Sequence, residues 1–217
     1  MKRMAVIAGA CLLVPMAQAG SRMDQFLMAD RSAEIALART AAPKAVSDDA
    51  GVMVLGRQGY EMAVQGSNGF VCMVLRSWTA GVDFPEFWNP KIHAPICFNA
   101  VAVRTYLPLM TARARLLFAG KSKEEMAAAI SAALDKKQLP TQEVGAMCYM
   151  MSKDGHLNDG AGHWHPHLMF FVPLADAKAW GADVPGSPVL ADRDTLDRLT
   201  IFMVPVAKWS DGTPDSQ

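Results

Sequence analysis

The chain has few of the residues that carry metal or redox chemistry: four cysteines and five histidines in 217 residues. Its 21 basic and 21 acidic residues balance, so it lacks the positive charge that binds nucleic acid or anionic lipid. Beyond residue 19, no apolar run reaches the roughly 20 residues that a membrane span needs. The sequence also lacks H-E-x-x-H and G-x-S-x-G, the motifs of zinc peptidases and serine hydrolases. These absences argue against a nucleic-acid partner, a membrane span and those two enzyme classes.

The first residues, MKRMAVIAGACLLVPMAQA, have the pattern of a secretory signal peptide. Lys2 and Arg3 form the positive start, an apolar stretch follows, and A-Q-A is a small-residue cleavage site. A membrane anchor or a lipid attached to Cys11 is a weaker alternative, because the apolar run is short. We therefore expect a signal peptide at 1–19 and a secreted protein at 20–217, periplasmic if the source is a Gram-negative bacterium. Its 19 basic and 21 acidic residues give a net charge near −2.

Three cysteines remain after that cleavage: Cys72, Cys97 and Cys148. In an oxidising compartment we expect one pair to form a disulfide and one thiol to remain. Three pairings are possible, and we favour Cys72 with Cys97, because this bond would tie the irregular stretch between them to the strand that holds Cys72. The alternative is three buried thiols that act as small apolar side chains.

Hydrophobic periodicity predicts an alternation of strands and helices. We expect strands at 52–56, 60–64, 70–75, 146–151, 163–173 and 199–207. We expect helices at 23–41, from Ala100 after an Asn99 cap, from Pro108 to Phe118, and at 123–137 after the capping box of Ser122 and Glu125. The whole predicts a single α+β domain, with a mostly antiparallel sheet of five to six strands and a block of helices.

Two connections carry specific expectations. QGSNG separates the strands at 60–64 and 70–75, and its residues tolerate positive φ, so we predict that these two strands form a β-hairpin. The stretch 79–99 has three prolines and four aromatic residues, a composition that opposes regular structure. We expect it to be an ordered loop packed on the domain, of the kind that often carries function.

Three of the five histidines lie at alternate positions in the segment GHWHPH: His163, His165 and His167. On an extended chain these side chains leave from one face. Residues two apart are then about 6.6 Å apart and the outer pair about 13 Å, so two imidazoles can share one ion and the third needs a bend, for which Pro166 is suited. His156 and Asp159 lie close by in the sequence, and His93 lies in the aromatic loop.

Neutral imidazole is the commonest protein ligand for zinc and copper, so we predict a transition-metal site. Its candidate ligands are His163, His165, His167, His156, Asp159 and His93. A metal-free polar or catalytic site is one alternative, and histidines that only hold a loop through hydrogen bonds are another. The twelve methionines outside the signal segment would suit copper, although methionine also fills cores.

The stretches GFVCMVLRSW, PEFWNPKIHAPICFN and GAMCYMMSKDGHLNDGAGHWHPHLMFF resemble a family of exported bacterial proteins of unknown function. The similarity runs from about residue 30 to 173. It implies that the strand pair, the aromatic loop and the histidine segment belong to one domain, and it implies no activity, substrate or metal.

Three functions follow from these observations. The first is an exported protein that binds zinc or copper. The second is a metal-dependent hydrolase, in which Asp154 or Asp159 would act as the base; a nucleophile pair of Cys148 with a histidine is disfavoured, since Cys148 lies in an apolar strand. The third is a non-catalytic domain of the cell envelope that binds a small molecule or has a structural role.

Overall fold

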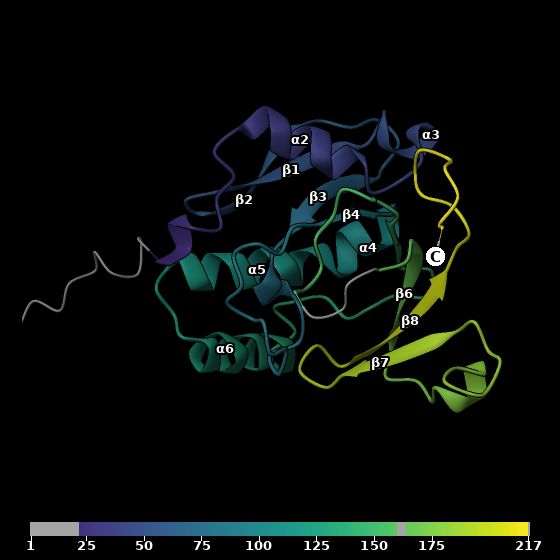
Figure 1. Cartoon of the computed structure of the whole chain (residues 1–217). Helices are drawn as coiled ribbons and strands as arrows, with labels where there is room; N and C mark the ends of the chain where they lie inside the picture. The colour runs from purple at the N-terminus through teal and green to yellow at the C-terminus, as the bar shows by residue number, and fades with distance from the viewer. Residues whose placement is uncertain (1–21, 160–163, 217) are drawn as a thin grey trace, which may run out of the picture.

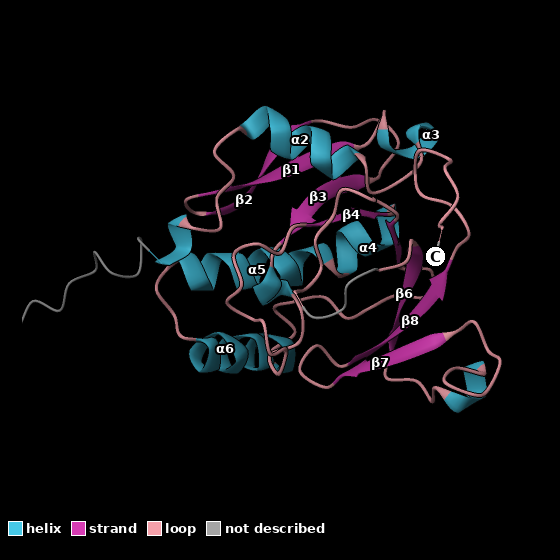
Figure 2. Cartoon of the chain, in the orientation of Figure 1, coloured by secondary structure: helices cyan, strands magenta, loops and turns pink. Residues whose placement is uncertain are grey.

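The computed structural model describes residues 22–159 and 164–216. The predicted signal peptide at 1–19 and the candidate ligand His163 lie outside these residues. Figures 1 and 2 show one sheet with helices on both sides, so the predicted α+β class is confirmed. Among the described residues, no helix has the length and apolar character needed to cross a bilayer.

The sheet has eight strands in the order β2-β1-β3-β4-β5-β6-β8-β7. Only β1 and β3 pair in parallel; every other neighbouring pair is antiparallel. The strands are β1 (Gly51–Gly56), β2 (Gly59–Val64), β3 (Val71–Leu75), β4 (Ala94–Phe98), β5 (Met147–Met150), β6 (His167–Pro173), β7 (Leu190–Asp194) and β8 (Leu199–Pro205). The prediction of five to six strands was therefore wrong, because it missed β4 and β7.

Strand β4 lies within the stretch that we expected to be irregular. Pro95 is its second residue and has no N–H for a sheet ladder. It is tolerated because β5 pairs with β4 only at Cys97 and Phe98, so Pro95 lies where β4 pairs with β3 alone. All five residues of β4 are buried, and the rest of the aromatic stretch, 80–93, is the expected loop.

The predicted hairpin between 60–64 and 70–75 was also wrong. Strand β2 turns back on β1 through Arg57 and Gln58, and Gly59 takes a positive φ of 106° at the end of this turn. The chain then crosses the end of β1 to reach β3. A Cβ on Gly66 would lie 2.0 Å from the main-chain nitrogen of Gly51, so the QGSNG segment provides a close crossing and does not form the turn of a hairpin.

Helices cover the two faces of the sheet differently (Figure 2). Helix α2 (Arg31–Arg39) packs on β1, β3 and β4, with the short helix α3 (Lys44–Ser47) beside it. On the other face lie α4 (Ala100–Thr105) and α5 (Leu107–Phe118), with α6 (Lys123–Asp135) packed against α5. Two short 3₁₀ turns, η1 (Ser77–Thr79) and η2 (Lys178–Trp180), complete the regular structure.

The face beneath α2 is built from small side chains and holds the disulfide. Ala38 packs with Val52 and Val74, and Cys72 and Cys97 are direct partners across β3 and β4. These two cysteines are bonded, which confirms the predicted pairing, and Cys148 is a free buried thiol. Burial raises the pKa of the Cys148 thiol, so it remains protonated and a poor nucleophile.

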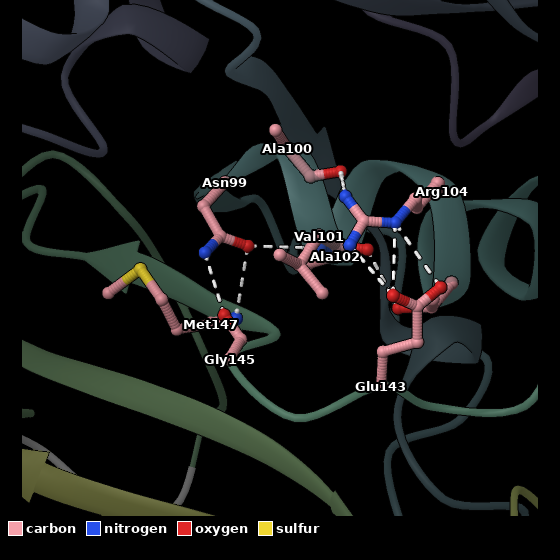
Figure 3. Close-up of polar contacts among 9 residues, drawn as sticks. Asn99, Ala100, Val101, Ala102, Arg104, Glu143, Gly145 and Met147 are labelled. Atoms are coloured by element: carbon pink, nitrogen blue, oxygen red, sulfur yellow. Dashed lines mark hydrogen bonds and ion pairs between the residues drawn. The ribbon is translucent and has the colours of Figure 1, made fainter.

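The first helix is shorter than predicted, and the three later helices begin where their caps place them. Asp30 accepts hydrogen bonds from Ser32 and Ala33 and starts α2 within the stretch 23–41. Asn99 accepts from the N–H of Ala102 at 2.9 Å and donates to the carbonyl oxygen of Gly145 at 2.8 Å. It thus starts α4 and fixes the entry to β5 (Figure 3). The capping box is present at the start of α6, and a proline lies in the first turn of α5.

Candidate functional site

The described part of the histidine segment lies at one end of β6. That strand begins at His167, so the prediction that it starts at residue 163 was wrong. The Nδ1 of His165 lies 2.6 Å from a carboxylate oxygen of Asp215, near the C-terminus. The Nδ1 of His167 lies 2.8 Å from the carbonyl oxygen of His165, which makes it the donor of that hydrogen bond. Both rings are thus held by protein partners.

Trp164 connects the histidine segment to Trp209 and to the loop after β5. Its ring meets His167 edge-on, with centroids 5.9 Å apart, and meets Trp209 at 5.1 Å. Gly155 lies against it, because a Cβ there would be 3.2 Å from the indole. Burial, more than any neighbouring charge, lowers the pKa of His167. The imidazole of His167 is therefore neutral at pH 7.

His93 and His156 meet in a backbone bridge of two hydrogen bonds, 2.9 and 2.8 Å long. Residues that exchange both hydrogen bonds project their side chains from the same face. Burial, followed by the charges of Arg76 and His156, lowers the pKa of His93 to about 4. His93 is therefore neutral at pH 7. The bridge joins the aromatic loop to the loop after β5.

Asp159 completes this second group. Its carboxylate lies 2.9 Å from Nε2 of His156 and accepts a hydrogen bond from Asn89 at 2.9 Å. Its own N–H donates to Glu86, and Lys91 lies 3.6 Å away. The hydrogen bond to His156 is the main reason why the pKa of Asp159 is lowered. These contacts fasten 86–91 to 156–159.

The candidate ligands thus form two groups within the described residues, His165 with His167 and His93 with His156 and Asp159. In those residues no three side chains of the His, Cys, Asp and Glu types are arranged to hold a metal ion. Asp154 is exposed on the loop after β5 and joins neither group through a side-chain contact. The metal site and the hydrolase remain predictions.

A cavity of about 290 Å³ lies on the face of the sheet that α5 covers. Its floor comes from five neighbouring strands, β3 to β6 and β8. The aromatic loop and the residues after His156 border it as well. The side chains of its floor are mostly apolar: Leu75, Ala94, Met150, Met169, Ile201 and Met203. Met169 and Met203 are direct partners across β6 and β8.

One end of this cavity is acidic. Asp192 and Asp194 on β7 line it, and both also line an adjoining hollow of about 220 Å³ together with Asp83. Burial, and then the charges of Asp194 and Asp83, raises the pKa of Asp192.

A buried ion pair lies behind Asp194. The guanidinium of Arg113 bonds Asp197, and both side chains are fully buried. Arg113 also lies 3.9 Å from the carboxylate of Asp194. Asp197 Oδ2 and Arg113 Nε are buried with no hydrogen-bond partner in the described chain. Burial outweighs the arginine and raises the pKa of Asp197 to about 6.

Tyr106, at the junction of α4 and α5, borders the same cavity. Its ring stacks on Phe171 with centroids 4.1 Å apart, and the residue is 6% exposed. Burial, and then the charge of Asp197, raises its pKa well above 10, so the hydroxyl stays protonated.

Sequence reasoning missed the site at Tyr106, Asp192 and Asp194. The signal available was the spacing of Asp192 and Asp194, two residues apart, which places both carboxylates on one face of a strand. Tyr106 carries no such signal, because it lies in a helical stretch that we interpreted as scaffold.

No protein-family model, curated protein or solved structure matches this chain. The resemblance to exported bacterial proteins therefore stays a prediction.

Proposed function

We propose that this protein is an exported ligand-binding protein whose cavity takes a small, largely apolar organic molecule. The observation that carries the proposal is the cavity of about 290 Å³, with an apolar floor and a few polar groups at one end. This combination is characteristic of small-molecule sites. Since a water molecule occupies about 30 Å³, the cavity has room for roughly ten heavy atoms.

Two observations support export. The first 19 residues have the composition of a signal peptide, and the bond between Cys72 and Cys97 is of a kind that persists in oxidising compartments. We propose a secreted or periplasmic location on this basis.

The histidine groups have a structural role in this proposal. The Nδ1 atoms of His165 and His167 already have protein partners, and Asp159 is shared between His156 and Asn89. In this arrangement the imidazoles hold the loop after β5, the aromatic loop and the C-terminal segment around the sheet. Two of these three segments border the cavity, so the groups serve to shape it.

The test compares ligand binding by the wild-type protein with binding by a variant in which a larger side chain fills the cavity. We expect a molecule of roughly ten heavy atoms to raise the melting temperature of the wild-type protein, since binding only the folded state stabilises it. Met203→Trp places an indole on the cavity floor and should abolish this shift. Val204→Trp is the matched control, because its side chain leaves from the opposite face of β8.

The probes are octan-1-ol, octylammonium and octanoate, which share one apolar chain and differ in charge. The proposal fails if none of the three binds, or if Met203→Trp binds as the wild type does. Circular dichroism of both tryptophan variants checks that each one folds.

A further inference from the structure

The polar end of the cavity has an excess of negative charge. Four carboxylates lie at this end, those of Asp83, Asp192, Asp194 and Asp197, and the only cation that pairs with any of them in the described structure is Arg113. Among the described residues, neither Asp83 nor Asp192 forms an ion pair. Carboxylates that repel one another without a positive partner favour binding of a cation.

The neighbouring arginines do not supply that partner. Arg193 lies between Asp192 and Asp194 on β7 and borders the adjoining hollow of about 220 Å³, but it does not line the cavity of about 290 Å³. Arg76 borders the cavity, but its guanidinium donates to the carbonyl oxygens of Phe26 and Val74 and to Glu34. Among the described residues that line this cavity, no arginine is therefore available to bind an anion.

Tyr106 gives an independent indication of a polar ligand. It lines the cavity and is buried to more than nine-tenths. Among the described residues its hydroxyl has no hydrogen-bond partner, although most buried tyrosines find one. A phenol oxygen can accept a hydrogen bond from an ammonium group.

The rest of the cavity limits what kind of cation fits. Its floor is apolar, and three methionines, Met150, Met169 and Met203, contribute to it. A hydrated inorganic ion would leave this surface exposed to water, whereas an organic cation with an apolar body covers it. The complementary ligand is thus positive at one end and apolar at the other.

Building on the proposed function, we infer that the cavity binds an organic cation, an ammonium group on an apolar body. The ammonium group lies at the carboxylates of Asp192 and Asp194 and donates a hydrogen bond to the hydroxyl of Tyr106. The apolar body lies over the methionine floor. Nothing in this binding step is covalent.

Isothermal titration calorimetry with the three eight-carbon probes tests the ligand class. Octylammonium should bind at least about tenfold more tightly than octan-1-ol, because hydrogen bonds to a charged group are stronger than neutral ones. Octanoate should bind more weakly than either, because the carboxylates repel it. High salt should reduce the preference for octylammonium, since part of it is Coulombic.

Two variants test where the ammonium group binds. Asp192→Asn should reduce octylammonium affinity about tenfold and leave octan-1-ol affinity unchanged. Tyr106→Phe should weaken octylammonium selectively as well. Asp49→Asn removes the same charge from an exposed loop next to α3 and is the control for non-specific attraction. Its affinities should equal those of the wild type.

The possible failures can be told apart. If octan-1-ol or octanoate binds as tightly as octylammonium, and Met203→Trp abolishes that binding, the inference is overturned and the ligand-binding function stands. If Asp192→Asn and Asp49→Asn weaken octylammonium equally, the attraction is non-specific and the inference is overturned. If no probe binds, or Met203→Trp leaves binding unchanged, the proposed function falls together with the inference.

Discussion

The two ends of β8 hold polar side chains in opposite arrangements. His167 is the register partner of Pro205 at one end of this strand, and Asp194 is the partner of Leu199 at the other. At the histidine end, imidazoles bond to a carboxylate or a carbonyl oxygen of the protein. At the acidic end, Asp192 forms no ion pair with any described residue, and Asp197 has a buried oxygen without a partner.

This difference distinguishes polar groups that stabilise the fold from polar groups that can bind a ligand. Polar groups that are satisfied by the fold stabilise it and gain little from a further ligand, whereas buried groups that lack partners raise the free energy of the empty protein. A ligand that forms hydrogen bonds or ion pairs with these groups lowers that free energy. The histidine contacts therefore indicate how one end of the sheet is held together, whereas the exposed Asp192 and the unpartnered Oδ2 of Asp197 lie at the end where we propose that a cation binds.

The largest expected effect comes from the ion pair behind the acidic end. Arg113→Met leaves Asp197 buried without a cation and should lower the free energy of unfolding by about 3–5 kcal/mol. Urea unfolding measures this loss. Arg115→Met, an exposed neighbour on α5, is the control and should change stability by less than about 0.5 kcal/mol.

A second substitution tests the cause of that loss. Adding Asp197→Asn to Arg113→Met removes the unpaired charge and should restore part of the stability. A loss below about 1 kcal/mol in Arg113→Met, or no recovery in the double variant, would contradict a charged pair in the core.

The acidic end of β8 and the bridge between His93 and His156 should respond to acid with opposite signs. Asp197 has a folded pKa of about 6, above its unfolded value near 3.9. Between these values the folded protein binds more protons, so its contribution to stability increases as pH falls. His93 has a folded pKa of about 4, below its unfolded value near 6.5. Here the unfolded chain binds more protons, so stability decreases as pH falls.

Urea unfolding at pH 7 and pH 5 measures both contributions. The wild type should gain about 1 kcal/mol relative to Asp197→Asn between these two values. It should lose on the order of 1 kcal/mol relative to His93→Gln, after allowance for the partial exposure of this ring. The same sign for both differences would contradict the opposite pKa shifts of Asp197 and His93.

Local signals in the sequence predicted much of the fold. The Asn99 cap, the proline of α5 and the capping box at Ser122 each act within one helical turn, so the sequence window contains the whole interaction. Cys72 and Cys97 were also paired correctly. That prediction rested on what the bond would tie together, and adjacent strands provide the required proximity.

Long-range pairing could not be predicted in the same way. The turn chemistry of QGSNG suits a hairpin, yet β2 pairs with β1 through the shorter turn at Arg57 and Gln58, and β3 pairs with β1 and β4 across longer stretches of chain. Strand β7 was missed because two of its five residues are aspartates, whose side chains point into a polar space. The alternation that identifies a half-buried strand is lost when the inward side chains are charged.

The candidate site was hidden for a related reason. The cavity collects Leu75, Tyr106, Met150, Asp192 and Met203 from segments spread over most of the chain. None of them belongs to a motif, and each alone has an ordinary structural interpretation. The histidines at 156–167 were conspicuous because they are close in sequence, but closeness in sequence did not bring His156 and His167 into one group.

The smallest expected effect concerns the metal that the histidine spacing predicts. If the protein takes up zinc, the structure favours the group of His93, His156 and Asp159, because the His156 ring is 45% exposed and a carboxylate already lies beside it. His167 is a poorer ligand, since its ring is less accessible than that of His156. Titration with zinc should therefore shift the ring NMR signals of His156 and His93 before those of His167.

Two variants check this order: His156→Ala should remove the response to zinc, and His167→Ala should keep it. The reverse order, with uptake of one zinc per chain lost in His167→Ala alone, would place chemistry at the histidine end of β8 and reverse the assignment of the two ends.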